Sequence, residues 1–463
     1  MNGRVLRTEL RRSVAPWAGL VVLGGSLAVL YAINGLWWRG TTAWTSQWTS
    51  LALTTRSMLA YLWPLSVGFG AVYGLRDSRS RMAELLASTP RPAWRRAALP
   101  AGALALALAS GFGLLVLWGA GQVVLGDADY LPAGWLPISL VAALALVAGA
   151  VFGMGVARTV PSVLVPPILV VGFLLTVMYL RQTTDGALPS GVAPNRLSQL
   201  SPVTEMPREM LLTLSGAVDL GQALWFLGLL GTGFALVAAS TRRARLLAVA
   251  PVLAGAALAL TVLPADPRDT FVVDRAAAAL VCDGPVCVTR AHRAQLPELA
   301  PSGKEALRVL HEALGDQAPA ALHEETALRA IGDDRTLSGD VVLIDFDDPL
   351  VAGASGADLT RLLVAQGLAP NCWPRTIWEG GGQTAIPAQS VGASWALGDH
   401  RLVPLQQPEG DRFSQQAWTN ARTAWETLNA LPAAEQRSRM AQVRAAALSC
   451  GTVLAPLTGE ASR

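Results

Sequence analysis

Seven apolar runs between Ala15 and Pro264 contain no Asp, Glu, Lys or Arg. Each run is about long enough to cross the roughly 30 Å hydrocarbon core of a bilayer as a helix. The runs lack the polar–apolar alternation of a membrane β-barrel strand, so helices are the remaining way to satisfy the backbone in lipid. We therefore expect an integral membrane protein with seven transmembrane helices. The runs span residues 15–38, 57–75, 98–125, 136–157, 161–180, 222–240 and 246–264.

Arginine is unevenly distributed among the segments that connect these runs. Fourteen arginines precede the first run, lie between the second and third, or follow the fourth and sixth, whereas five lie in the alternate segments. Because Arg near a helix end resists translocation, this distribution places the amino terminus in the cytoplasm and, after seven crossings, the carboxyl terminus outside. The scarcity of lysine, with Lys304 alone against many Arg, Ala, Gly and Pro, is typical of high-GC bacteria. We expect a multi-pass protein of a bacterial cell membrane.

The four cysteines all follow the last apolar run. Thiols confined to the expected outer domain indicate disulfides in an oxidising compartment. Cys282 and Cys287 enclose a turn-prone Asp-Gly-Pro-Val tetrapeptide, so we expect them to pair with each other and Cys372 to pair with Cys450. Buried free thiols are the alternative, and a zinc site is disfavoured because no second closely spaced cysteine pair exists.

The composition becomes typical of a soluble domain after residue 265, where charged residues and Pro appear and apolar runs shorten. Residues 341–346 read as a buried strand, and four segments read as helices. The expected fold is a membrane all-α helical bundle followed by a soluble, disulfide-containing, mixed α/β extracytoplasmic domain. The four helical segments are residues 304–314, 358–363, 413–430 and 433–448. The expected domains are a cytoplasmic amphipathic helix (1–12), a six-helix domain (13–245), a seventh transmembrane helix (246–264) and the outer domain (265–463).

The longest inner connection, residues 76–97, has an amphipathic pattern. Met82, Leu85 and Leu86 form a short apolar stripe beside Glu84 and several arginines, and two prolines end any helix there. This pattern predicts a short helix along the membrane surface. Attraction of its basic residues to anionic lipid is one explanation of the segment.

The layout resembles the permease subunits of type-2 ABC exporters. Members of that family have an amphipathic helix, six membrane helices, a coupling helix after the second and a larger outer loop between the fifth and sixth. Here these positions correspond to residues 1–12, the first six runs, residues 82–89 and residues 181–221, with the sequence Glu-Leu-Leu-Ala-Ser-Thr-Pro at 84–90. The seventh helix and the outer domain are additions, so the resemblance carries over no substrate. Residues 281–299 look like part of the outer domains appended to actinobacterial ABC permeases.

The resemblance implies that the inner loop docks onto a cytoplasmic ATP-binding-cassette ATPase and that two permease copies form the translocation path. The implied docking residues are Met82, Glu84, Leu85, Leu86 and Arg91. No G-x-x-x-x-G-K-[ST] motif occurs in the chain, so we expect ATP and Mg²⁺ to be bound by the partner subunit and no cofactor to be bound here. No Asp, Glu, Lys or His lies inside an apolar run, which argues against an ion-coupled carrier.

The outer domain lacks complete hydrolase motifs. His311-Glu312 and His323-Glu324 have no second His four residues after the first, and no G-x-S-x-G occurs. We therefore expect no enzymatic activity. The carboxylates at 345, 347 and 348 suit either a cation or a solvated turn, and the tryptophans at 373, 378 and 395 suit either a binding face or the core.

Two pairs of glycines have the small-x-x-x-small spacing that lets membrane helices approach closely: Gly70 with Gly74, and Gly149 with Gly153. The arginines lie at membrane boundaries instead of on one soluble face, so a nucleic-acid partner is not expected. The leading hypothesis is an exporter permease in the lipid bilayer. The alternative is a non-transporting membrane sensor or anchor whose outer domain binds a ligand or a protein partner.

Overall fold

The computed structural model divides the chain into two compact units. Unit 1 comprises Met1–Asp127 and Leu131–Val272, and unit 2 comprises Ala128–Tyr130 and Val273–Arg463. The structure describes residues 13–33, 44–45, 47–76, 92–126, 130–181, 196–204, 211–266, 269–326, 336–346, 348–371, 382–407 and 412–458. The predicted amphipathic helix at 1–12 lies outside the described residues.

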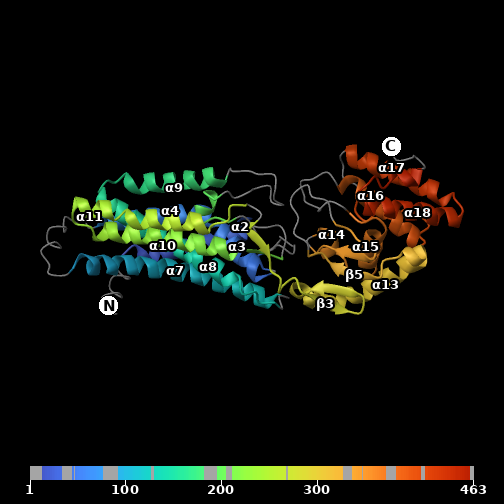
Figure 1. Ribbon diagram of the computed structural model, residues 1–463, viewed down its shortest axis with the longest axis horizontal. Coiled ribbons are helices and arrows are strands. Elements are labelled where there is room, and N and C mark those ends of the chain that lie inside the picture. The colour runs from blue at the N-terminus through green and yellow to red at the C-terminus, as the bar shows by residue number, and fades with distance from the viewer. Residues whose placement is uncertain are drawn as a thin grey trace. The chain divides into compact units, whose positions relative to one another are not determined.

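Unit 1 is a bundle of apolar helices that run alongside one another (Figure 1). The short helix α3 lies toward one end of the bundle and α11 toward the other (Figure 1). A two-stranded sheet, β1–β2, completes the unit. The helices are α2 (Ala15–Ile33), α3 (Trp48–Ser57), α4 (Leu59–Gly74), α7 (Ala93–Leu125), α8 (Trp135–Thr159), α9 (Val165–Arg181), η1 (Ser198–Leu200), α10 (Gly216–Ala238), α11 (Arg242–Leu247) and α12 (Ala250–Val262), and the strands are β1 (Leu212–Leu214) and β2 (Phe271–Val273).

Among the described residues, five helical segments are long enough and apolar enough to cross a membrane: Ala15–Ala32, Trp94–Leu125, Trp135–Thr159, Gly216–Ala238 and Arg242–Val262. Membrane insertion is therefore consistent with the structure, although two of the seven expected crossings are shorter helices. α4 has 16 residues and is separated from α3 only by Met58, and α9 has 17. α9 is short because the first residues of its apolar run form a turn, in which the Val165 amide donates to the Ser162 carbonyl at 3.1 Å.

Close approach of α4 and α8 depends on glycine. Gly70 and Gly74 of α4 and Gly149 and Gly153 of α8 all lie at this interface. A Cβ on Gly70 would overlap the carbonyl oxygen of Ala150, and a Cβ on Gly74 would lie 2.5 Å from the carbonyl oxygen of Met154. The backbone of each helix therefore occupies space that a side chain would fill on its neighbour.

We expect Gly153→Ala to destabilise unit 1, because its Cβ would overlap the carbonyl oxygen of Val67 and the two backbones would have to separate. Overpacking of this kind costs about 1–3 kcal/mol. Gly172→Ala in α9 is the matched control, since a Cβ there meets nothing within 4 Å. Thermal denaturation in detergent should show a lower midpoint for Gly153→Ala only. Equal midpoints for both variants would contradict this packing.

Unit 2 contains a four-stranded sheet of order β3-β4-β5-β6. β3 and β4 form an antiparallel hairpin, and β4, β5 and β6 are parallel. Cys282 and Cys287 face each other across the hairpin and form the expected disulfide, and Gly284 supplies the positive φ of the turn between them. Cys450 is described but Cys372 is not, so the second pairing stays a prediction. The strands are β3 (Leu280–Asp283), β4 (Val286–Thr289), β5 (Ala321–Glu324) and β6 (Val341–Ile344).

Helices pack on this sheet around one apolar core. Leu310, Leu363, Val391, Trp425 and Val443 bring five helices onto the residues of β4, β5 and β6. This arrangement agrees with the expected mixed α/β domain, and α18 has the bounds expected from sequence. The helices are η3 (Arg290–Gln295), α13 (Leu296–Leu314), η4 (Gly315–Gln317), α14 (Pro349–Ala352), α15 (Gly356–Leu368), α16 (Gly382–Ala396), α17 (Arg412–Asn429), α18 (Ala433–Leu448) and α19 (Ala455–Thr458).

Arg444 of α18 ties three segments of unit 2 together. Its guanidinium donates to the carbonyl oxygens of Gly367 at 2.9 Å and Gln317 at 2.7 Å, and to that of Gly339. Burial lowers the pKa of Arg444 from its ordinary value, and the charge of Asp340 opposes that shift. The side chain therefore provides a donor to the buried carbonyl group of Gly367, at the end of α15, and links it to the segments at 317 and 339.

Candidate functional site

The residues implied as the ATPase docking surface, Met82, Glu84, Leu85, Leu86 and Arg91, lie outside the described residues. The structure does correct the end of that loop. α7 begins at Ala93, so the last residues of the expected connection, 93–97, belong to a helix. The guanidinium of Arg95 lies 5.1 Å from the ring centroid of Trp94, an arrangement that places a cation and an aromatic ring together in the first turn.

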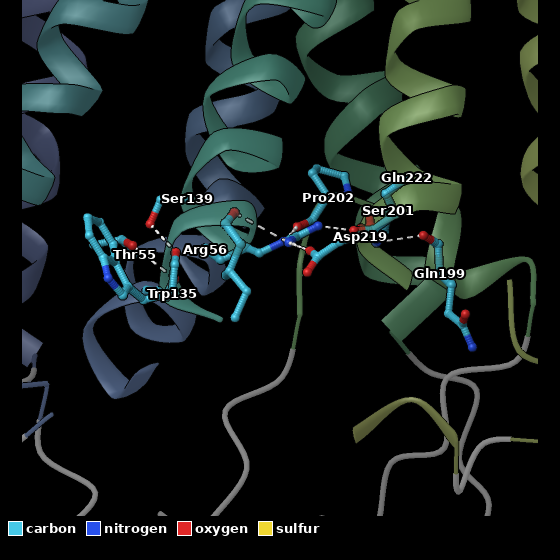
Figure 2. Close-up of polar contacts among 11 residues, drawn as sticks. Thr55, Arg56, Trp135, Ser139, Gln199, Ser201, Pro202, Asp219 and Gln222 are labelled. Atoms are coloured by element: carbon cyan, nitrogen blue, oxygen red, sulfur yellow. Dashed lines mark hydrogen bonds and ion pairs between the residues drawn. The ribbon is translucent and has the colours of Figure 1, made fainter. Parts of the chain in front are cut away.

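A buried arginine lies at the end of unit 1 where α8 and α10 begin. Arg56, in the last turn of α3, has no exposed surface. Its Nε donates to the carbonyl oxygen of Pro202 at 3.1 Å, and its Nη1 lies 3.4 Å from that of Ile138. The same Nη1 lies 3.0 Å from Oδ1 of Asp219, and Nη2 donates to Oε1 of Gln222 (Figure 2).

Gln222 extends this network to a neighbouring loop. Its side-chain Nε2 donates to the carbonyl oxygens of Gln199 at 2.7 Å and Ser201 at 2.9 Å (Figure 2). The side-chain amide of Gln222 therefore accepts from Arg56 through its oxygen and donates to the loop through its nitrogen. We call the set of Arg56, Asp219 and Gln222, with the carbonyl groups they bind, the Arg56 cluster.

The local sequence explains why these groups meet. Asp219 and Gln222 are three residues apart on α10, so they lie on the same face of the helix. Asp219 is in the first turn, where the helix dipole favours a negative charge. Two residues of a buried apolar set adjoin the cluster: Ile138 supplies a carbonyl oxygen to Arg56, and Val218 precedes Asp219 in α10. The set consists of Ala52, Leu53, Ile138, Leu214, Val218, Ala259 and Leu263.

Because the cluster is buried, each of its charged groups needs a partner within the protein. A guanidinium removed from water requires a counter-charge and hydrogen-bond acceptors, and here Asp219, one amide oxygen and two carbonyl oxygens supply them. Removing one partner of a buried ion pair costs about 3–5 kcal/mol, because the other charge is left uncompensated. The cluster thus holds α3, α8, α10 and the loop at 196–204 in one arrangement.

Sequence reasoning missed this cluster for an identifiable reason. The apolar run that became α10 was expected to begin at Gln222, whereas the helix begins at Gly216 and includes Asp219. Arg56 was taken as a loop arginine beside the second run. The run at 222–240 is uncharged, but the helix built on it begins earlier and therefore carries the charge of Asp219. The sequence did contain a signal. Arg56 immediately precedes the second apolar run, and Asp219, of opposite charge, lies three residues before the sixth.

A second buried polar pair lies in unit 2, at the carboxyl ends of parallel strands. Nδ1 of His292 lies 2.6 Å from Oε1 of Glu324, and both side chains are 4% exposed. Oε2 of Glu324 accepts the backbone amide of Thr289 at 2.6 Å, and the imidazole lies against the ring of Phe346. Nε2 of His292 has no hydrogen-bond partner among the residues that the structure describes. Glu324 thus links β5 to the end of β4.

The other candidate residues of the outer domain are not brought into a site. Within the described ranges no group of three or more His, Cys, Asp or Glu side chains could hold a metal ion. Asp347 lies outside those ranges, and Oδ1 of Asp348 accepts the backbone amide of Leu350 at 3.0 Å, as in a turn. Trp395 donates Nε1 to Oε1 of Gln436 at 3.0 Å and packs against the core, while Trp373 and Trp378 are not described.

Comparison of the chain with protein-family models, with curated proteins and with solved structures found no match. The geometry of the Arg56 cluster and the distribution of charge along the bundle therefore carry the functional argument.

We expect Arg56→Met and Asp219→Leu each to lower the stability of unit 1 by about 3–5 kcal/mol, because each leaves a buried charge unpaired. The double variant should be less destabilised than the sum of the two, because it removes both charges and keeps apolar volume. Denaturation of the detergent-solubilised variants measures this double-mutant cycle. Additive losses would show that the two side chains do not act as a pair.

Proposed function

We propose that the chain is the transmembrane permease subunit of an ATP-binding-cassette exporter. In this proposal two copies form the translocation path, a separate cytoplasmic ATPase supplies the energy, and an amphiphilic or peptide-like substrate moves outward. The positions of charged side chains in the bundle support this proposal.

The observation that carries the proposal is the position of the ionisable side chains in the described helices of unit 1. α2, α4 and α12 contain no Asp, Glu, Lys, Arg or His, and the acidic residue of α10 lies in its first turn, paired with Arg56. Carriers that couple to protons or ions generally need an ionisable group within the membrane to relay charge. A bundle whose buried charge is fixed at one end is better suited to energy supplied by a partner subunit.

The arginine distribution indicates the side on which that partner would act. Arg242, Arg243 and Arg245 of α11 and Arg95 and Arg96 of α7 belong to the arginine-rich set of segments. By the positive-inside rule these segments are cytoplasmic, which puts the Arg56 cluster toward the outer surface and unit 2 outside the cell. The Cys282–Cys287 disulfide agrees with an oxidising compartment for unit 2.

A non-transporting sensor or anchor is the second candidate. It is favoured by one observation, the separate core of unit 2, which is a compact unit with its own sheet and helices. In that reading unit 2 binds a ligand or a protein partner, and unit 1 tethers it to the bilayer. The two candidates differ in whether the inner loop binds an ATPase.

Replacing Leu85 and Leu86 together by Asp should abolish co-purification of a cytoplasmic ATPase, because the apolar docking stripe would carry two charges. Leu131→Asp is the control, since Leu131 is 62% exposed and lies in the segment between α7 and α8, on the expected outer side. Pull-down of the detergent-solubilised protein, with mass spectrometry of its partners, measures the result. Equal ATPase recovery from all forms, or none from the unaltered protein, would oppose the exporter proposal.

Thiol labelling of intact cells tests the proposed orientation. A cysteine introduced at Asn420, exposed on α17, should react with a membrane-impermeant maleimide, because unit 2 is placed outside. A cysteine at Arg243, exposed on α11, should react only after permeabilisation. The reverse pattern would invert the topology and remove the basis for a cytoplasmic docking loop.

A further inference from the structure

The chain returns to the Arg56 cluster just before it leaves unit 1. Thr270 is 3% exposed and lies between α12 and the division of the chain at Val272 and Val273. Its carbonyl oxygen accepts the backbone amide of Ser215 at 2.9 Å. Its side-chain Oγ1 accepts from Nε2 of Gln199 at 3.4 Å.

Strand pairing strengthens the same connection. β1 (Leu212–Leu214) ends next to Ser215, the N-cap residue of α10, and pairs with β2 (Phe271–Val273). The partly buried ring of Phe271 packs against the apolar set that contains Ile138 and Val218. The β1–β2 ribbon, defined as these two strands with Ser215 and Thr270, is thus built on the start of α10.

These contacts form an unbroken path of hydrogen bonds. Arg56 donates to Gln222, Gln222 donates to the carbonyl oxygen of Gln199, and the side chain of Gln199 donates to Thr270. A second path runs along the backbone, from Thr270 through the amide of Ser215 to the first turn of α10. Every member is buried, so opening one contact leaves polar groups without partners in an apolar environment, which is costly.

We propose that the Arg56 cluster and the β1–β2 ribbon form one cooperative element, which couples the ends of α3, α8 and α10 to the segment that leads into unit 2. A rearrangement that separates α10 from α3 loosens the ribbon. An event in unit 2 that pulls on β2 loosens the cluster by the same coupling free energy, since coupling between sites is reciprocal. The proposal does not depend on the exporter function, because a sensor or anchor would use the same connection.

Hydrogen exchange of the full chain in lipid nanodiscs, read by mass spectrometry, tests the coupling in both directions. Asp219→Asn removes the charge that pairs with Arg56, and we expect exchange in peptides covering 211–216 and 269–274 to become about tenfold faster or more. Thr270→Val removes the hydroxyl that accepts from Gln199 and keeps the shape of the side chain. We expect it to accelerate exchange in the first turn of α10.

Thr261→Val is the matched control for Thr270→Val. Among the described residues, Oγ1 of Thr261 bonds only to the carbonyl oxygen of Leu258 in its own helix, at 2.7 Å, so exchange in α10 and in the ribbon should be unchanged. Gln199→Met is a milder alternative if Asp219→Asn does not fold, because it removes the amide that joins the two halves and leaves the ion pair intact. It should accelerate exchange in the ribbon.

Accelerated exchange in α10 with an unchanged ribbon in Asp219→Asn, or in the ribbon with an unchanged α10 in Thr270→Val, would overturn the proposal. The same holds if Gln199→Met behaves like the unaltered chain. These readouts are independent of ATPase association, so failure of the docking experiment and failure of the coupling experiment are distinguishable.

Discussion

The guanidinium of Arg56 sets the main constraint on unit 1. A permanent positive charge without exposed surface must have a fixed set of acceptors, and those acceptors come from α8, from α10 and from the loop at 196–204. Elsewhere the helices of unit 1 meet mainly through apolar side chains and glycines, with single hydrogen bonds such as those from Trp118 to Tyr31 and from the Val252 amide to Thr232. The arginine supplies a fixed orientation at one end of the bundle, and the returning chain at Thr270 builds on the result.

The two ends of the bundle also differ in the exposure of their basic side chains. At the end with α11, basic side chains are exposed and available to a headgroup or a partner protein. At the end with α3, the basic side chain is enclosed and committed to internal bonds. Exposed basic side chains at one end and a defined internal junction at the other agree with the function that we propose.

Hydrophobicity predicted where the helices of unit 1 lie because lipid demands long apolar segments, and the start of α18 was predictable because Pro432 just before it is a local signal. Hydrophobicity did not predict the elements whose bounds or conformation depend on tertiary contacts. α10 extends beyond its apolar run because Arg56 satisfies Asp219, and the residues of β1 are extended because β2 offers a pairing partner. The sequence did not predict the His292–Glu324 pair either, because residues so far apart in the chain meet only when the parallel strands β4 and β5 are paired.

The meshing of α4 with α8 restricts how this protein can move. Where a carbonyl group of one helix sits over a glycine of the other, a displacement of one residue, about 1.5 Å along the axis, drives that carbonyl into a neighbouring side chain. The two helices therefore cannot slide along each other, and they move as one rigid body. Gly19 and Gly111 join α2 to α7 by the same close backbone approach, and Gly228 and Gly255 join α10 to α12, so flexing is possible between such rigid pairs of helices but not within them.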